Sequence, residues 1–153
     1  MEIREITRDK KRYLSLLLLA DEQENMIDRY LDKGTMYVLD DGGIKSECVV
    51  TDEGHGILEI KNIATEPIFH GKGYGTALIC FLVDKYQEQY KILQVGTGES
   101  PSSIGFYEKC GFTYSHRVKN FFCDYYDHPI YENGVMLCDM VYLRKDLTGL
   151  KQK

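Results

Sequence analysis

A glycine-rich run, His70-Gly71-Lys72-Gly73-Tyr74-Gly75-Thr76, has the residue types and spacing of a phosphate-binding turn. It follows an apolar strand-like segment and precedes a segment whose apolar residues recur at helical spacing. The first amides of a helix have no partners within the helix, and the helix dipole adds roughly half a positive charge there. Because glycines let a diphosphate approach those amides closely, the run predicts an anion site at the start of a helix.

Two common glycine motifs do not fit this run. A P-loop requires Ser or Thr directly after its lysine, whereas Gly73 follows Lys72 here. A dinucleotide fingerprint requires Gly-x-Gly-x-x-Gly and an acidic residue that closes the next strand, but the next strand ends in Val95-Gly96-Thr97. A flexible turn with no ligand remains the alternative, since glycine alternation alone is a weak signal.

A second run, Phe106-Tyr107-Glu108-Lys109-Cys110-Gly111-Phe112, lies downstream of the first. Together, in this order and spacing, the two runs resemble the signatures of the GCN5-related N-acetyltransferase (GNAT) superfamily, which binds acetyl-coenzyme A. The resemblance covers nearly the whole chain. It departs from the family pattern at His70, where the family carries Gln or Arg, and at Ser100, where it usually carries Asn.

The resemblance implies a geometry for the cofactor. Two neighbouring parallel strands, here 57–65 and 92–96, splay apart at the centre of the sheet, and the pantetheine arm enters between them. Gly96-Thr97-Gly98 would keep this gap free of side chains, with a tight turn as the alternative. The residues expected to bind the cofactor are Ile63, Ala64, Thr65, His70, Gly71, Lys72, Gly73, Tyr74, Gly75, Thr76, Ser100, Ser103, Phe106, Tyr107 and Lys109.

The chemistry requires a base for the amine and an acid for the departing thiolate, because an alkylammonium has a pKa near 10.4. Glu59 is the expected base, since it lies at the offset from the glycine motif at which the histone-acetylating branch carries its glutamate. The alternative is a solvated glutamate on the strand face of Lys61. Tyr107 is the expected acid, with core packing before Gly111 as the alternative.

Two segments with weaker patterns are expected to select the acceptor. One is the helix pair over 9–33, and the other is the stretch 120–131, which is dense in aromatic and acidic residues. Rings and carboxylates together can hold an ammonium group. Aromatic residues at this density can equally form a dimer contact or fill a core.

The elements that position these residues alternate along the chain. Strands are expected at Glu2–Ile6, Thr35–Leu39, Lys45–Thr51, Ile57–Thr65, Ile92–Gly96 and Phe112–Val118, with an Asn-Gly hairpin over 130–137 continuing into a last strand at Asp139–Leu143. Helices are expected at Asp9–Ala20, from about Asp21 to Gly34, from the glycine turn to about Gln89, and at Ser102–Lys109. The predicted fold class is α+β: a mixed, mostly antiparallel sheet of about seven strands, splayed at its centre and flanked by about four helices.

Length, charge and cysteine content limit the number of domains and the kinds of partner that this chain can have. A chain of 153 residues predicts one domain over 1–153, and a net charge of −5 without a basic stripe makes nucleic acid an unlikely partner. Five scattered cysteines predict neither disulfides nor a metal site, and the absence of a long apolar run or signal peptide predicts a cytoplasmic protein without a membrane partner.

The sequence therefore predicts an N-acetyltransferase that moves an acetyl group from acetyl-CoA directly to a primary amine of a small molecule or a protein, as a monomer or a homodimer. Two alternatives stay open. One is a CoA-binding sensor of the same fold with little turnover, and the other is a different nucleotide-binding protein that uses the same glycine turn.

Overall fold

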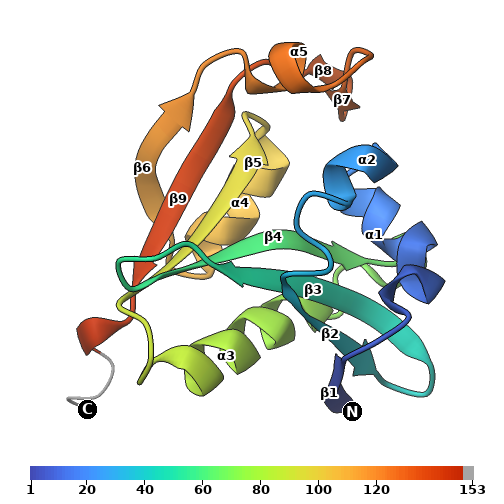
Figure 1. Cartoon of the computed structure of the whole chain (residues 1–153), viewed down its shortest axis with the longest axis vertical. Helices are drawn as coiled ribbons and strands as arrows, with labels where there is room; N and C mark the ends of the chain where they lie inside the picture. Colours follow the sequence, from blue (N-terminus) through green and yellow to red (C-terminus); the bar gives the residue numbers. More distant parts are fainter. Residues whose placement is uncertain (150–153) are drawn as a thin grey trace.

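The computed structural model describes residues 1–149. Seven strands form the main sheet in the order β1-β2-β3-β4-β5-β9-β6 (Figure 1). The strands are β1 Glu2–Ile6, β2 Thr35–Asp40, β3 Ile44–Asp52, β4 Ile57–Thr65, β5 Ile92–Gly98, β6 Thr113–Val118, β7 Tyr131–Glu132, β8 Val135–Met136 and β9 Met140–Asp146. The helices are η1 Lys10–Tyr13, α1 Leu14–Ala20, α2 Glu24–Ile27, η2 Pro67–Phe69, α3 Tyr74–Tyr86, α4 Pro101–Lys109 and α5 Phe121–Tyr125.

The sheet is mixed and mostly antiparallel, as predicted. β1 to β4 form an antiparallel meander, and α3 returns the chain so that β5 lies parallel to β4. β9 then pairs antiparallel with both β5 and β6. The predicted fold class is therefore confirmed, and the predicted strands of the main sheet end within about three residues of the observed ones.

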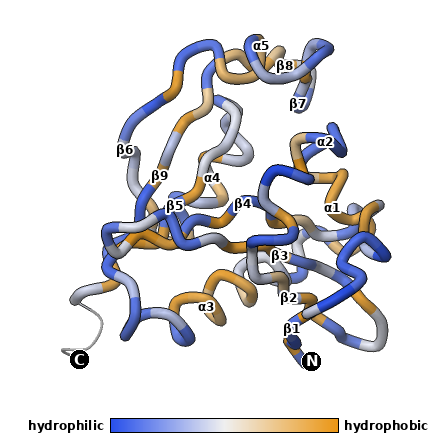
Figure 2. The backbone as a smooth tube through the Cα atoms, in the orientation of Figure 1, coloured by the Kyte–Doolittle hydropathy of each residue, from blue (hydrophilic) through white to orange (hydrophobic). Residues whose placement is uncertain are grey.

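Helices cover both faces of the sheet, which explains the continuous apolar run in β2. Tyr37 and Leu39 pack in one core with Leu78 of α3, while Met36 and Val38 pack on the opposite face with α1 and α2. Successive side chains of a strand point to opposite faces, so a strand covered on both sides is apolar at every position. Figure 2 shows the matching apolar stretches in α1 and α3, the helices of the two outer layers.

The prediction of two full helices over 9–33 is wrong. The first begins as a 3₁₀ turn after Asp9, whose φ is 53°, and only Leu14–Ala20 is α-helical. The second has a single α-helical stretch, Glu24–Ile27, and its N-cap residue is Gln23. Asp21 does not cap this helix, and its carboxylate accepts hydrogen bonds from the Tyr30 and Tyr126 hydroxyls.

The segment 120–137 differs from the prediction in two ways. It contains a short helix, α5, that the sequence pattern does not indicate. The Asn-Gly hairpin forms, with Asn133 at φ 50° and Gly134 at φ 80°, but β7 and β8 make a separate two-stranded sheet and do not continue into β9. Figure 1 shows α5 and this hairpin beyond the end of β5, facing α2.

Candidate active site

The central feature of the site is a gap between β4 and β5. Their parallel pairing runs from Ile57 with Ile92 to Ile60 with Val95 and stops there, although both strands continue. On the other side of β4, Val50 pairs with Ile60 and Val49 with Asn62, so the register skips Lys61. A bulge of this kind bends and twists its strand, which accounts for the separation of β4 from β5.

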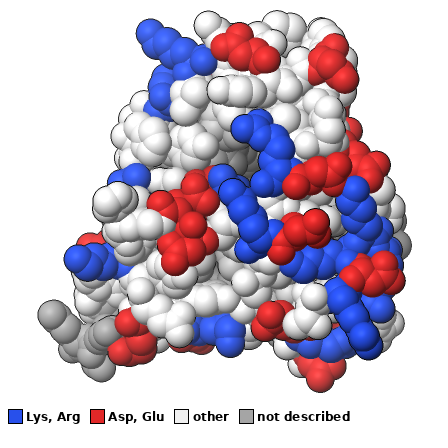
Figure 3. Space-filling model, viewed as in Figure 1, with Lys and Arg blue, Asp and Glu red and all other residues white. Residues whose placement is uncertain are grey.

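A cavity of about 450 Å³ lies at this gap. Its walls are the separated ends of β4 and β5, Ser103 and Tyr107 of α4, the residues Asp21 and Glu22 after α1, and side chains from the segment 122–140. Figure 3 shows a hollow near the middle of this face, with both acidic and basic side chains around it. The cavity therefore joins the predicted cofactor gap to the two segments expected to select the acceptor.

The backbone of β4 offers hydrogen-bonding groups to this gap. The Ala64 carbonyl accepts a hydrogen bond of 2.7 Å from the Ser46 hydroxyl, and the Glu66 N–H donates to the Lys45 carbonyl. Alternate residues of an antiparallel pair direct their backbone groups to opposite sides. The groups of Ile63 and Thr65 therefore face the gap, and those of Ala64 face β3.

The glycine run forms the turn into α3, as predicted. Gly71 and Gly73 have φ of 79° and 85°, a backbone conformation that residues with a Cβ rarely adopt. The Ala77 N–H donates to the Gly73 carbonyl as the first bond of the helix, and no side chain caps it. The N–H groups of residues 74–76 are therefore without a helical partner and are available to an anion.

The two sequence motifs meet in space. A Cβ at Gly75 would lie 3.0 Å from the ring of Phe106, so glycine allows α3 and α4 to pack closely. His70 lines the cavity and its Nε2 lies 2.9 Å from the Thr65 carbonyl oxygen. Lys72 and Thr76 are exposed beside the turn, and the Tyr74 hydroxyl donates to Asp41.

Tyr107 lies in the cavity wall with 8% of its surface exposed. Burial, followed by the negative charge of Glu132, raises its pKa above the usual range of phenols. The hydroxyl therefore carries its proton throughout the neutral pH range, the state that a proton donor requires.

Glu59 is not among the residues that line the cavity. Its carboxylate is 6% exposed, accepts a hydrogen bond of 2.7 Å from the Gln94 amide and forms an ion pair of 2.9 Å with Lys61. The Arg144 guanidinium donates a hydrogen bond to the side-chain carbonyl oxygen of Gln94. The structure thus places Glu59 in a buried network in the part of β4 that is paired with β5.

The remaining predicted residues divide between the cavity and other surroundings. Ser103 lines the cavity, and its hydroxyl lies 2.9 Å from both Glu132 carboxylate oxygens. Ser100, with 1% of its surface exposed, does not line the cavity, and its hydroxyl lies 3.2 Å from that of Ser102. Lys109 is exposed at the end of α4, away from the cavity wall.

The tight turn that was the alternative for Gly96 and Gly98 does not form. Both lie within β5 and line the cavity, but neither is in a turn. A Cβ at Gly96 would lie 2.9 Å from the Met140 sulfur, and one at Gly98 would lie 2.5 Å from Leu137. The glycines therefore allow side chains near the start of β9 to pack against β5.

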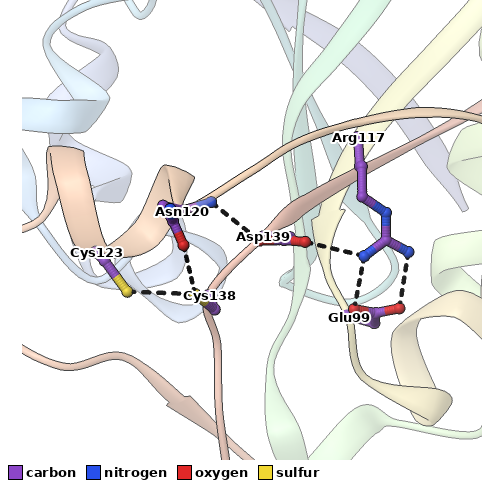
Figure 4. A network of polar contacts seen from close by, with 6 residues as sticks. All are labelled: Glu99, Arg117, Asn120, Cys123, Cys138 and Asp139. Atoms are coloured by element: carbon purple, nitrogen blue, oxygen red, sulfur yellow. Dashed lines mark hydrogen bonds and ion pairs between the residues drawn. The ribbon is translucent and has the colours of Figure 1, made fainter.

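We call residues 120–137 the strap, because this segment connects β6 to β9 by way of the cavity wall. Its first residues are attached to the start of β9: the Asn120 N–H donates to Asp139 and the Phe122 N–H to the Cys138 carbonyl. Figure 4 shows this attachment, in which Arg117 bridges Asp139 and Glu99, and the sulfurs of Cys123 and Cys138 lie 3.5 Å apart.

The far end of the strap contacts the segment between α1 and α2. The Tyr126 hydroxyl donates to Asp21 at 2.8 Å, the Asp127 N–H donates to Gln23 at 3.1 Å, and His128 Nε2 lies 2.9 Å from a Glu22 oxygen. These partners are more than 100 residues apart in sequence. The sequence marks both segments as candidates for acceptor selection but carries no signal that they meet.

Comparisons with known proteins agree with this geometry. A family model described as an acetyltransferase (GNAT) domain matches residues 32–114. The chain is 33% identical over 150 residues to an uncharacterised N-acetyltransferase, YvbK, of Bacillus subtilis (strain 168), with 96% of each chain covered.

Two solved structures are similar over nearly the whole chain. A GNAT family acetyltransferase from Elizabethkingia anophelis with acetyl-CoA bound is 35% identical, with a TM-score of 0.89 and coverage of 95% of this chain and 97% of that one. A Bacillus subtilis acetyltransferase in complex with CoA is 30% identical, with a TM-score of 0.86 and coverage of 95% and 97%.

The chain therefore belongs to the GNAT acetyltransferase family. It is an N-acetyltransferase whose co-substrate is acetyl-CoA. Among residues 1–149, no helix is both long enough and apolar enough to cross a lipid bilayer.

Proposed function

We propose that this protein transfers the acetyl group of acetyl-CoA directly to a primary amine, with both substrates bound in the cavity at once. The observation that carries the proposal is the continuity of that cavity. It runs from the gap where β4 and β5 separate, past Tyr107, to the wall formed by the strap and the segment after α1. A thioester in the gap and an amine from the strap side would meet beside Tyr107.

The proposed cofactor contacts follow from the backbone. Ile63 and Thr65 would pair with the pantetheine arm as a further strand would, because their backbone groups face the gap. The free N–H groups of residues 74–76 would hold the diphosphate, helped by the positive end of α3 and the exposed Lys72. Phe106 and Ser103 would line the path between these two sites.

Tyr107 is the proposed general acid. As the amine nitrogen bonds to the carbonyl carbon and the carbon–sulfur bond breaks, the tyrosine hydroxyl would give its proton to the leaving thiolate. A phenol keeps its proton at neutral pH, so the hydroxyl still holds the proton when the sulfur acquires charge.

The general base predicted at Glu59 is not carried into this proposal. Both carboxylate oxygens are engaged by Lys61 and Gln94, and the group does not reach the cavity wall. We propose that Glu59 instead positions the bulged part of β4 through Lys61. The proton of the attacking amine would then leave through solvent in the cavity.

The acceptor is proposed to be a primary amine on a small molecule or a protein. A single domain over 1–153, a cytoplasmic location and a possible homodimer remain predictions from the sequence.

Release of free CoA thiol from acetyl-CoA over a panel of primary amines tests the proposed transfer. We expect CoA to bind and ATP and NAD not to bind in calorimetry, and we expect thiol release to depend on the amine. Tight CoA binding with no release over the whole panel would instead support the sensor of the same fold. A double-reciprocal plot with parallel lines would contradict transfer in a ternary complex.

A further inference from the structure

Asp21 is the carboxylate that the strap and the α1–α2 segment hold in the cavity wall. The Tyr30 hydroxyl donates to its Oδ2 at 3.0 Å, and the Tyr126 hydroxyl donates to its Oδ1 at 2.8 Å. The carboxylate therefore has one fixed orientation. Each of its oxygens retains capacity for a further donor, because an ionised carboxylate has about four acceptor positions.

No cation within residues 1–149 forms an ion pair with Asp21. The other charged residues of the cavity wall add to the excess of negative charge around Asp21. Glu132 adds a second carboxylate to the wall and Glu22, which contacts His128, adds a third, whereas the single lysine of the wall, Lys61, is paired with Glu59. A half-buried carboxylate without a cation is costly, so an incoming positive group would be favoured there.

A second observation points to a ligand at the same place. Asn62 lines the cavity with 3% of its surface exposed, and its Nδ2 donates to the Leu17 carbonyl and to the Tyr30 hydroxyl. Its Oδ1 is buried and has no hydrogen-bond partner in the described chain. Tyr30 links Asn62 to Asp21, so an unused amide oxygen and a carboxylate without a cation belong to one network.

An alkylammonium group matches this network in number and charge. It carries three N–H donors and one positive charge, while the network offers carboxylate oxygens and an amide oxygen. Three aromatic residues line the same cavity, and the face of an aromatic ring attracts a cation; they are Phe122, Tyr126 and Tyr131.

Only one of two amines in such an acceptor would react. The attacking nitrogen must lose its proton, so it cannot remain an ammonium ion paired with Asp21. A second ammonium group keeps its charge during the transfer and can stay bound to the carboxylate.

We propose, on the basis of the function proposed above, that Asp21 is a specificity-determining residue that binds a second ammonium group of the acceptor, and that the preferred acceptor is a small diamine. Tyr30 and Tyr126 orient the carboxylate, and Asn62 supplies the additional oxygen. The chemistry of the acceptor class therefore follows from the cavity wall contributed by the α1–α2 segment and the strap.

Acceptors of equal length test this proposal. We would measure kcat and KM of the full chain with acetyl-CoA and 1,4-diaminobutane, 1-aminobutane or 4-aminobutanoate. The diamine is expected to have a kcat/KM about 10- to 100-fold above that of the monoamine, which is the range for a hydrogen bond to a charged group. 4-Aminobutanoate is expected to be the poorest acceptor, because its carboxylate would face Asp21.

The Asp21→Asn variant keeps the shape of the side chain and removes its charge. We expect it to raise the KM for the diamine about 10- to 100-fold, with less than a threefold change for the monoamine. Asp32→Asn makes the same charge change at an exposed position outside the cavity and should alter neither substrate. Tyr126→Phe, which keeps the charge and removes one orienting bond, should reduce the preference for the diamine by roughly threefold.

Thermal unfolding and CoA calorimetry of Asp21→Asn show whether the variant is folded. If Asp21→Asn is not folded, the wild-type protein provides the test, through its binding of the diamine in the presence of CoA. Displacement of the bound diamine by 1-aminobutane at equal concentration would overturn the proposed role of Asp21. Equal losses for the diamine and the monoamine in a folded variant would also overturn it. If no amine is acetylated although acetyl-CoA binds, the proposed transfer itself is wrong; if amines react without preference for the diamine, only the role of Asp21 is wrong.

Discussion

The cofactor half of the site and its acceptor half are built in different ways. We define the cofactor half as β4, the glycine turn with α3, and β5, which together span Ile57–Gly98. The acceptor half consists of the segment 14–31 and the strap. In the cofactor half, neighbouring residues in sequence form the site, and most of the expected contacts come from the backbone. In the acceptor half, residues more than 100 positions apart in sequence are in direct contact.

The two halves also differ in packing. The core under the cofactor half is continuous and includes Leu58, Leu78 and Leu93, all with at most 2% of their surface exposed. Within residues 1–149, the cluster of the strap has three buried members, Phe122, Ile130 and Leu137, with a few partly buried residues packed against them. A small cluster resists local opening less than a continuous core does. We therefore expect cofactor binding to depend on the continuous core of the sheet and acceptor selection to depend on a segment held by a few polar contacts.

Replacing Tyr107, which lies where the two halves meet, should have the largest effect. We expect Tyr107→Phe to lower kcat about 100-fold, because the leaving thiolate loses its proton donor, and to leave the Kd for acetyl-CoA nearly unchanged. Initial rates and calorimetry measure the two quantities separately. A loss of affinity equal to the loss of rate would contradict the role of acid.

Gly73→Ala tests whether the cofactor half depends on its backbone. A φ of 85° costs a residue with a Cβ about 1–2 kcal/mol, and relief of that strain would turn the amides of α3 away from the diphosphate. We expect CoA to bind about 10-fold more weakly. Gly54→Ala is the matched control, because Gly54 has a φ of 81° and the same open space in the turn between β3 and β4. It should lose similar stability and keep CoA affinity.

Glu59→Gln tests whether the network below the gap is structural. We expect the free energy of unfolding in urea to fall by about 1–3 kcal/mol, because Lys61 loses a charged partner in a largely buried network. The pH dependence of kcat/KM should keep its shape. If the acidic limb of that profile disappears, Glu59 is the general base after all.

His128→Gln tests the attachment of the strap and should have the smallest effect. Hydrogen bonds to Asp127 and Glu22 raise the pKa of the exposed His128 in the folded protein above its usual value of 6.5. A pKa raised by folding stabilises the folded state below the unfolded pKa, and this stabilisation is lost as pH rises through the folded pKa. The Tm difference between wild type and His128→Gln should therefore be larger at pH 6 than at pH 8.

Titration of His128 by NMR checks the cause of that difference. Glu22→Gln should move its pKa back toward the usual value, since one of the two acceptors loses its charge. An unchanged pKa in this variant would show that Glu22 does not hold the strap through His128.

Much of the cofactor half could be predicted because its signals are local. The strand β4, the stop at Pro67 and the turn at Gly71 and Gly73 follow one another within a short stretch, and each depends on its own residue types. The helix at Asp9–Ala20 could not be predicted correctly from its apolar face alone. There the side chain of Lys10 donates to the carbonyls of Leu31 and Gly34, a contact that follows from tertiary packing and not from local spacing.

By itself, the sequence determined the fold class and the glycine turn at the start of α3; its resemblance to the family added the separated parallel strands, and an anion site at that turn and Tyr107 as the acid stay predictions. Only the tertiary structure decided that Glu59 lies in a buried network, that Gly96 and Gly98 make room for Leu137 and Met140, and that Asp21 faces the cavity. The physical reason is the separation in sequence between the residues that interact. Turns, helix starts and strand periodicity arise between residues close in sequence, whereas the environment of a carboxylate depends on whichever distant side chains the folded sheet brings against it.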